Sequence, residues 1–166
     1  MKNKLIIYEL NELPRTLLNY YVKIKPYSNL SKFKKYGCDF DTFTTDKGEL
    51  HPWSTWPTFY RGVDNSKHGL KFINQDKSFA DQNYPSVWNI LSKKNISIGI
   101  FGSLQSYPPP QIDENIKFYL PDTFSIDEKS FPKKLEIFQK FNLSLVSDNN
   151  AITRNINSLQ IKNLIQ

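Results

Sequence analysis

Short apolar or alternating runs along the chain predict four β-strands. Residues 5–10 are almost continuously apolar, which is typical of a strand buried on both faces of a parallel sheet. Residues 38–45 alternate Phe with Thr and Asp, residues 96–101 form an Ile-rich run, and residues 117–120 are a further short candidate. We expect the runs at 5–10 and 96–101 to be buried neighbours or near-neighbours in one sheet.

Apolar side chains at helical spacing predict helices between these strands. Pro14 suits the first turn of one helix, and Pro26 stops it. Gly37 and Gly62 end two others, and Ser86 caps a fourth. The expected helices cover residues 14–24, 30–36, 54–61, 87–94 and 131–146, and the tail from residue 151 is compatible with a polar helix.

The alternation of strands and helices predicts the fold class. It favours an α/β fold with a layered, mostly parallel sheet flanked by helices. We assign residues 1–150 to this domain and residues 151–166 to a polar tail. No internal repeat or low-complexity linker divides the chain.

Composition narrows the function classes. An aromatic fraction of 14% is typical of a chain that folds around a core. The net charge is +6, but the lysines are scattered and no arginine-rich stretch occurs, which favours solvated helix faces over a nucleic-acid patch.

The expected compartment follows from the single cysteine, Cys38, and from the N-terminus. One cysteine allows no intrachain disulfide, which fits a reducing compartment. The first apolar run is too short for a signal peptide, and no stretch approaches the roughly 18–20 apolar residues of a membrane span. We therefore predict a cytoplasmic protein without a membrane partner.

The first candidate site lies where the strand at residues 5–10 ends. Glu9, Asn11 and Glu12 supply carboxylate and amide oxygens, which can ligate a metal ion. Ligands gather at the carboxyl ends of strands in open α/β sheets. The alternative is that Asn11 only caps the following helix.

The second candidate site is the helix start near Ser54 and Thr55. A hydroxyl there faces free backbone N–H groups and the positive end of the helix dipole, which suits a nucleophile and an anionic phosphoryl or sulfuryl ester. The alternative is that both residues are ordinary caps and that the flanking tryptophans belong to the core.

The third candidate site follows the same helix. Arg61 precedes Gly62, and a loop leads to His68 and Gly69. His68 could bind a metal ion or an oxyanion, although a lone histidine is more often structural.

Taken together, these pieces resemble the alkaline phosphatase superfamily, in its phosphodiesterase, nucleotide pyrophosphatase and sulfatase-like branches. The resemblance is an ordered series of weak motifs, and the order is more specific than any one motif. Asn11 stands at the position of a metal-binding Asp, and Arg61-Gly62 stands at the usual Thr-Gly. The matching segments are residues 5–12, 51–62, 68–69, 85–91, 98–101 and 107–109.

The resemblance implies a metal-dependent hydrolase of phosphate or sulfate esters, using divalent ions such as zinc. Thr55, or Ser54, would be the nucleophile; Asn11 with Glu9 or Glu12 would touch one metal; His68 and Arg61 would contact substrate. Such two-metal sites need several Asp and His ligands, whereas this chain has two histidines.

We therefore expect an incomplete alkaline-phosphatase-like domain that is inactive alone and exposes apolar surface. A complementary C-terminal chain or self-association would cover that surface. The alternative is a non-catalytic remnant, or a binding module for a phosphorylated or sulfated ligand.

Overall fold

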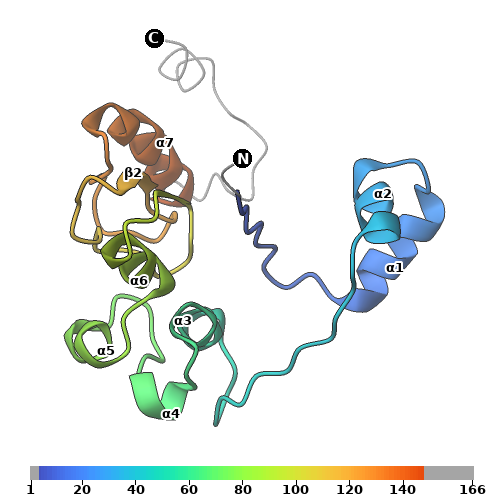
Figure 1. Cartoon of the computed structure of the whole chain (residues 1–166), viewed down its shortest axis with the longest axis horizontal. Coiled ribbons are helices and arrows are strands. Elements are labelled where there is room, and N and C mark those ends of the chain that lie inside the picture. The colour runs from blue at the N-terminus through green and yellow to red at the C-terminus, as the bar shows by residue number, and fades with distance from the viewer. Residues whose placement is uncertain (1–3, 148–166) are drawn as a thin grey trace. The chain divides into compact units, whose positions relative to one another are not determined.

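The computed structural model describes residues 4–147 (Figure 1). The chain divides into two compact units, Met1–Phe43 and Thr44–Gln166, and each is described by itself. The tail predicted from residue 151 lies outside the described residues. The assignment of residues 1–150 to one domain stays a prediction.

The first unit is a pair of short helices, as the sequence predicts. Helix α1 spans Arg15–Ile24 directly after Pro14, and α2 spans Asn29–Tyr36. The Ser28 hydroxyl caps α2 by accepting a 3.1 Å hydrogen bond from the Ser31 N–H. Ser31 is the only buried residue in the two helices, so the pair encloses almost no core.

The strands predicted at residues 5–10 and 38–45 are wrong, because neither segment forms a strand in the structure. A strand needs a neighbour to complete its backbone hydrogen bonds, and neither run has one. The side chains of Leu5 and Ile6 remain 84% and 88% exposed. The expectation that residues 5–10 and 96–101 form neighbouring strands of one sheet fails for the same reason, because residues 5–10 form no strand.

The second unit begins with four helices: α3 over Pro52–Arg61, α4 over Asn65–His68, α5 over Ser78–Asn83 and α6 over Val87–Lys93. Gly62 ends α3 as predicted, and it does so with φ of 66°, a left-handed conformation that suits glycine. The sequence pattern did not predict α5, which has few apolar residues and spans less than two turns.

A small parallel sheet completes the second unit. Strand β1 (Ile98–Phe101) pairs with β2 (Ile116–Leu120), which confirms two of the four predicted strands. Gly99 lies opposite Phe118, and a Cβ atom at Gly99 would come within 2.0 Å of that ring. A 3-10 turn over Lys133–Leu135 and helix α7 over Glu136–Ser147 follow, close to the helix predicted over 131–146.

The core joins α3, α6 and the sheet. Five buried side chains form it, and partly buried apolar side chains such as Trp56 and Phe131 pack against them. The tilted Tyr60 and Trp88 rings have centroids 4.9 Å apart and link α3 to α6. The cluster consists of Tyr60, Trp88, Ile100, Ile116 and Tyr119.

The described chain is therefore a mixed α/β structure with a two-stranded parallel sheet. No helix within residues 4–147 is both long and apolar enough to cross a membrane.

Candidate functional site

The predicted nucleophiles lie in the first turn of α3, and both hydroxyls contact protein groups. Ser54 is buried, and its Oγ accepts a 3.3 Å hydrogen bond from the Asn65 amide. Thr55 is half-buried, and its Oγ1 donates to the His51 carbonyl over 3.1 Å. A nucleophilic hydroxyl needs an adjacent base to take its proton. The two partners found here are a side-chain amide and a backbone carbonyl, and neither is such a base.

One turn further along α3, a hydroxyl does contact a histidine. Thr58 Oγ1 lies 2.9 Å from His68 Nε2 and donates to Asp46 Oδ1 over 2.6 Å. The Leu70 N–H donates to His68 Nδ1 over 3.0 Å, so we assign the ring proton to Nε2. The proton order therefore runs from His68 through Thr58 to Asp46, and the imidazole is not placed to act as a base toward Thr58.

The environment of His68 reinforces this structural role. The side chain is 1% exposed, and burial lowers its pKa, against the opposing effect of Asp46. The imidazole is therefore neutral at pH 7, with both nitrogens engaged. His68 has no free nitrogen for a substrate in this conformation.

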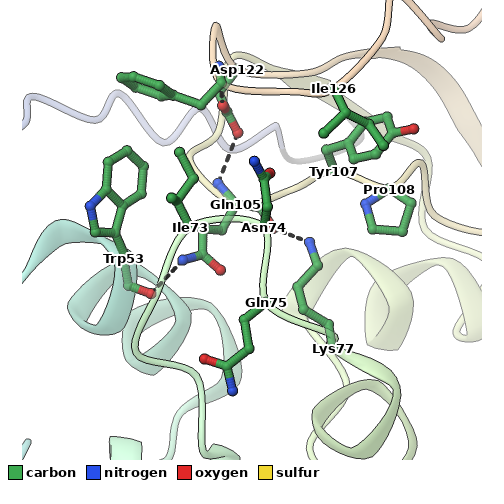
Figure 2. Close-up of a pocket in the computed structure, with 11 residues that line it drawn as sticks. Trp53, Ile73, Asn74, Gln75, Lys77, Gln105, Tyr107, Pro108, Asp122 and Ile126 are labelled. Atoms are coloured by element: carbon green, nitrogen blue, oxygen red, sulfur yellow. Dashed lines mark hydrogen bonds between the residues drawn. The ribbon is translucent and has the colours of Figure 1, made fainter.

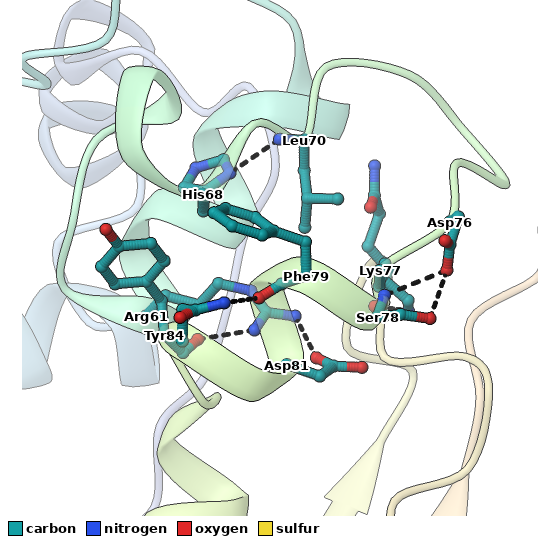
Figure 3. Close-up of polar contacts among 11 residues, drawn as sticks. Arg61, His68, Leu70, Asp76, Lys77, Ser78, Phe79, Asp81 and Tyr84 are labelled. Atoms are coloured by element: carbon teal, nitrogen blue, oxygen red, sulfur yellow. Dashed lines mark hydrogen bonds and ion pairs between the residues drawn. The ribbon is translucent and has the colours of Figure 1, made fainter.

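Arg61 serves as a tie between α3 and the α5 region (Figure 3). Its guanidinium donates to the Tyr84 carbonyl and to Asp81 Oδ1, each over 2.6 Å. The Arg61 side chain is 4% exposed, so the contact with Asp81 is largely shielded on the arginine side. The structure thus places Arg61 and His68 inside the protein, engaged with protein partners.

The predicted metal ligands lie in the first unit, in the segment that precedes α1. Glu9 is half-buried, whereas Asn11 and Glu12 are exposed, and Glu12 has a left-handed φ of 53°. Residues 4–147 contain no group of three or more His, Cys, Asp or Glu side chains that could hold a metal ion. The assignment of Asn11, Glu9 and Glu12 as ligands of a divalent ion stays a prediction.

A different part of the second unit forms a pocket, here called the Lys77 pocket (Figure 2). Its volume is about 180 Å³. Trp53 and Ile73 lie on one side in this view, and Tyr107 and Pro108 lie on the other. The full lining is Trp53, Ile73, Asn74, Gln75, Lys77, Gln105, Tyr107, Pro108, Asp122, Phe124 and Ile126.

Gln105 organises the polar side of this pocket. Its carbonyl accepts a 2.6 Å hydrogen bond from the Lys77 ammonium, and its N–H donates to Asp122 over 2.9 Å. Its amide side chain donates to the Trp53 carbonyl over 2.6 Å. These bonds hold Gln105 at a φ of 60°, which few non-glycine residues adopt.

Lys77 and Asp122, the two charged side chains of the pocket, have shifted pKa values. Burial lowers the pKa of Lys77 to about 8, partly offset by Asp81. Burial raises the pKa of Asp122, although the N–H groups of Phe124 and Gln105 oppose the shift. In both groups the shift of the pKa favours the neutral form. Ionisable groups with shifted pKa values in a concave region are features of binding sites.

Sequence reasoning missed Thr58, Asp46 and Lys77. Thr58 carried one usable signal, because it stands four residues after Ser54 and therefore on the same helix face. Asp46 and Lys77 lie outside regular helices and strands and outside any motif, so no local pattern marks them.

Comparisons with protein-family models, with curated proteins and with solved structures gave no match to this chain.

Proposed function

We propose that this chain is the N-terminal portion of a metal-dependent hydrolase of the alkaline phosphatase superfamily, similar to its phosphodiesterases, phosphatases and sulfatases. The ordered motifs of the sequence support the proposal. The parallel β1–β2 pair, with α6 directly before β1, is also a unit from which layered α/β sheets are built. In the complete domain, further strands extend this sheet, and residues beyond those described supply most ligands of the divalent ions.

We further propose that the chain alone does not hydrolyse esters. The observation that carries this is the internal engagement of Ser54, Arg61 and His68 with protein partners. A phosphoryl or sulfuryl group needs cationic or N–H donors that are free to bind it. Releasing His68 would leave the N–H of the buried Leu70 unpaired, and releasing Arg61 would break its bonds to Asp81 and to the Tyr84 carbonyl, so both changes are costly.

The second candidate is a non-catalytic module that binds a phosphorylated or sulfated ligand. The Lys77 pocket favours it, because it combines apolar walls with one cation. This candidate needs no metal ligands beyond the described residues.

Exposed aromatic side chains support a partner for the second unit. Phe72 and Phe101 are 67% and 75% exposed, and Phe101 belongs to β1. Such side chains would be covered by a complementary chain or by self-association. Light scattering on the purified protein is expected to show dimers or larger species, and a monodisperse monomer would contradict this part of the proposal.

Turnover assays test the catalytic proposal. The purified chain is incubated with p-nitrophenyl phosphate, bis(p-nitrophenyl) phosphate and p-nitrophenyl sulfate, with and without Zn²⁺ or Mn²⁺. The expected rate equals that of the Thr55→Ala variant and of buffer. A metal-dependent rate that Thr55→Ala abolishes would show that the chain holds a complete site.

A further inference from the structure

Lys77 stands in a wall shared by two pockets. The Lys77 pocket lies on one side, and a second pocket of about 290 Å³ is also lined by Lys77, Gln105 and Pro108. The second pocket contains Arg61 and Asp81, which pair with each other. Lys77 therefore borders two concave regions of the second unit.

Lys77 is a cation without an ion pair among the described residues. None of the salt bridges within residues 4–147 includes it; its assigned bond is the one to the Gln105 carbonyl. An ammonium has three N–H donors, so two remain for another acceptor. Asp81 and Asp122 favour the charged form of Lys77 without a salt bridge and offset its burial only in part, so an anionic ligand at the ammonium would stabilise the charge further.

Asp122, the one acidic residue of the Lys77 pocket, already has partners. Its Oδ2 accepts the Gln105 N–H over 2.9 Å, and its Oδ1 accepts the Phe124 N–H over 2.7 Å. These bonds direct the carboxylate toward its own loops. Asp122 and Lys77 favour each other's charged forms but form no salt bridge, so the Lys77 ammonium still has N–H donors for an outside anion.

The rest of the pocket is mostly apolar. The Trp53 and Phe124 rings meet edge to face with centroids 4.8 Å apart, and Ile73 lies beside Trp53 in Figure 2. A volume of about 180 Å³ lies below the range of roughly 300–1,000 Å³ that drug-sized ligands occupy. The space therefore suits a ligand with a single ring.

We propose that the Lys77 pocket binds a small phosphate or sulfate monoester that carries one ring, with its oxyanion on the Lys77 ammonium and its ring against Trp53, Phe124 and Ile73. The inference rests on the proposed function in that it names a ligand for the binding candidate. It does not depend on catalysis by this chain.

Binding is tested on the full chain by isothermal titration with phenylphosphonate and benzenesulfonate, which cannot be hydrolysed as esters, and with inorganic phosphate and phenol as fragments. We expect at least one of the ring-bearing anions to bind more tightly than either fragment. The comparison of the two anions distinguishes a phosphate from a sulfate ligand. If phosphate alone binds as well as phenylphosphonate, or phenol as well as both anions, the proposal is wrong.

Variants locate the site. Lys77→Gln is expected to weaken binding at least about tenfold, as loss of a charged hydrogen bond does, whereas Lys77→Arg retains part of it. Lys71→Gln removes the same charge from an exposed lysine and is expected to leave the affinity unchanged. Equal effects of Lys77→Gln and Lys71→Gln would overturn the proposal.

A measurement on the unmutated chain covers the case in which Lys77→Gln does not fold. Selective ¹³C-labelling of lysine gives each side chain a Cε–H NMR signal without altering its N–H groups, and only that of Lys77 is expected to shift strongly with phenylphosphonate. Uniform small shifts of all lysines would contradict the site. These readouts record binding, so a negative result would leave the proposal that the chain alone does not hydrolyse esters unchanged. Conversely, turnover would contradict the proposal on hydrolysis without affecting the proposal on binding at Lys77.

Discussion

His68 Nε2 lies 2.9 Å from Thr58 Oγ1, and this contact joins α4 to the middle of α3. The Asp46 carboxylate extends the chain of hydrogen bonds on the other side of Thr58 and also accepts the Asn65 N–H over 2.8 Å. The arrangement of carboxylate, hydroxyl and imidazole has the residue types of a catalytic triad. Its proton order, with the imidazole as donor, makes it a structural clasp instead.

Replacing Thr58 by Val tests the clasp. The change keeps the shape of the side chain, but it leaves the buried His68 N–H without its acceptor. We expect the free energy of unfolding to fall by about 1–3 kcal/mol, the cost of an unsatisfied buried donor. Urea unfolding measures it. Thr55→Val is the matched control, because that hydroxyl bonds only a backbone carbonyl in the same helix, and equal losses in both variants would contradict the clasp.

The pH dependence of stability reports on His68. Burial lowers its folded-state pKa below the unfolded value near 6.5, so the unfolded chain binds more protons at acidic pH. The stabilising effect of a neutral His68 is therefore fully present above pH 6.5 and is lost as pH falls below it. NMR titration of the imidazole C–H signals is expected to give a lower midpoint for His68 than for free histidine. A midpoint at or above 6.5 would contradict the neutral, donating imidazole.

Two arginines in ion pairs are expected to differ in their contribution to stability. Arg61 is almost completely buried, whereas the Arg15 side chain is 42% exposed and pairs with Asp39 on the surface. Arg61→Met removes the two 2.6 Å hydrogen bonds of a shielded guanidinium, to the Tyr84 carbonyl and to Asp81, and is expected to cost about 1–3 kcal/mol. Arg15→Met is expected to cost less than about 1 kcal/mol, as surface pairs do. The midpoints of urea unfolding compare them, and a larger loss for Arg15→Met would refute the assignment of Arg61 as a structural tie.

Much of the second unit could be predicted from local sequence signals. Gly62 ends α3, and Ile98–Phe101 forms a strand, because glycine at a helix end and an Ile-rich run are governed by local physics. Residues 5–10 show the limit of such reasoning. Their apolar pattern is suited to a buried strand, but burial depends on a neighbouring strand that no local pattern can supply.

The candidate site shows the same limit. The sequence drew attention to Ser54 and Thr55, whereas the hydroxyl that contacts His68 belongs to Thr58, one turn after Ser54. His68 and Arg61 have the residue types of a binding site, and the sequence could not show that both side chains are buried and bonded to protein groups. Their contact with a substrate stays a prediction. The sequence could not predict the pocket around Lys77, because segments around residues 53, 105 and 122, which are distant in the sequence, form its walls.

The alkaline limb of the stability curve tests the burial of Lys77 and Tyr119 together. The pKa of Lys77 is lowered to about 8, so between pH 8 and its unfolded value of 10.5 the unfolded chain binds more protons and stability rises with pH. Burial raises the pKa of Tyr119 above its usual value of 10, so the folded state keeps that proton longer and stability falls as pH rises beyond 10. Urea unfolding at constant ionic strength is therefore expected to show a rise from pH 8 followed by a decline above about pH 10. Lys77→Gln should abolish the rise and keep the decline, whereas Lys71→Gln should keep both. A rise that persists in Lys77→Gln would mean that another group causes it and that Lys77 is not held in a desolvated site.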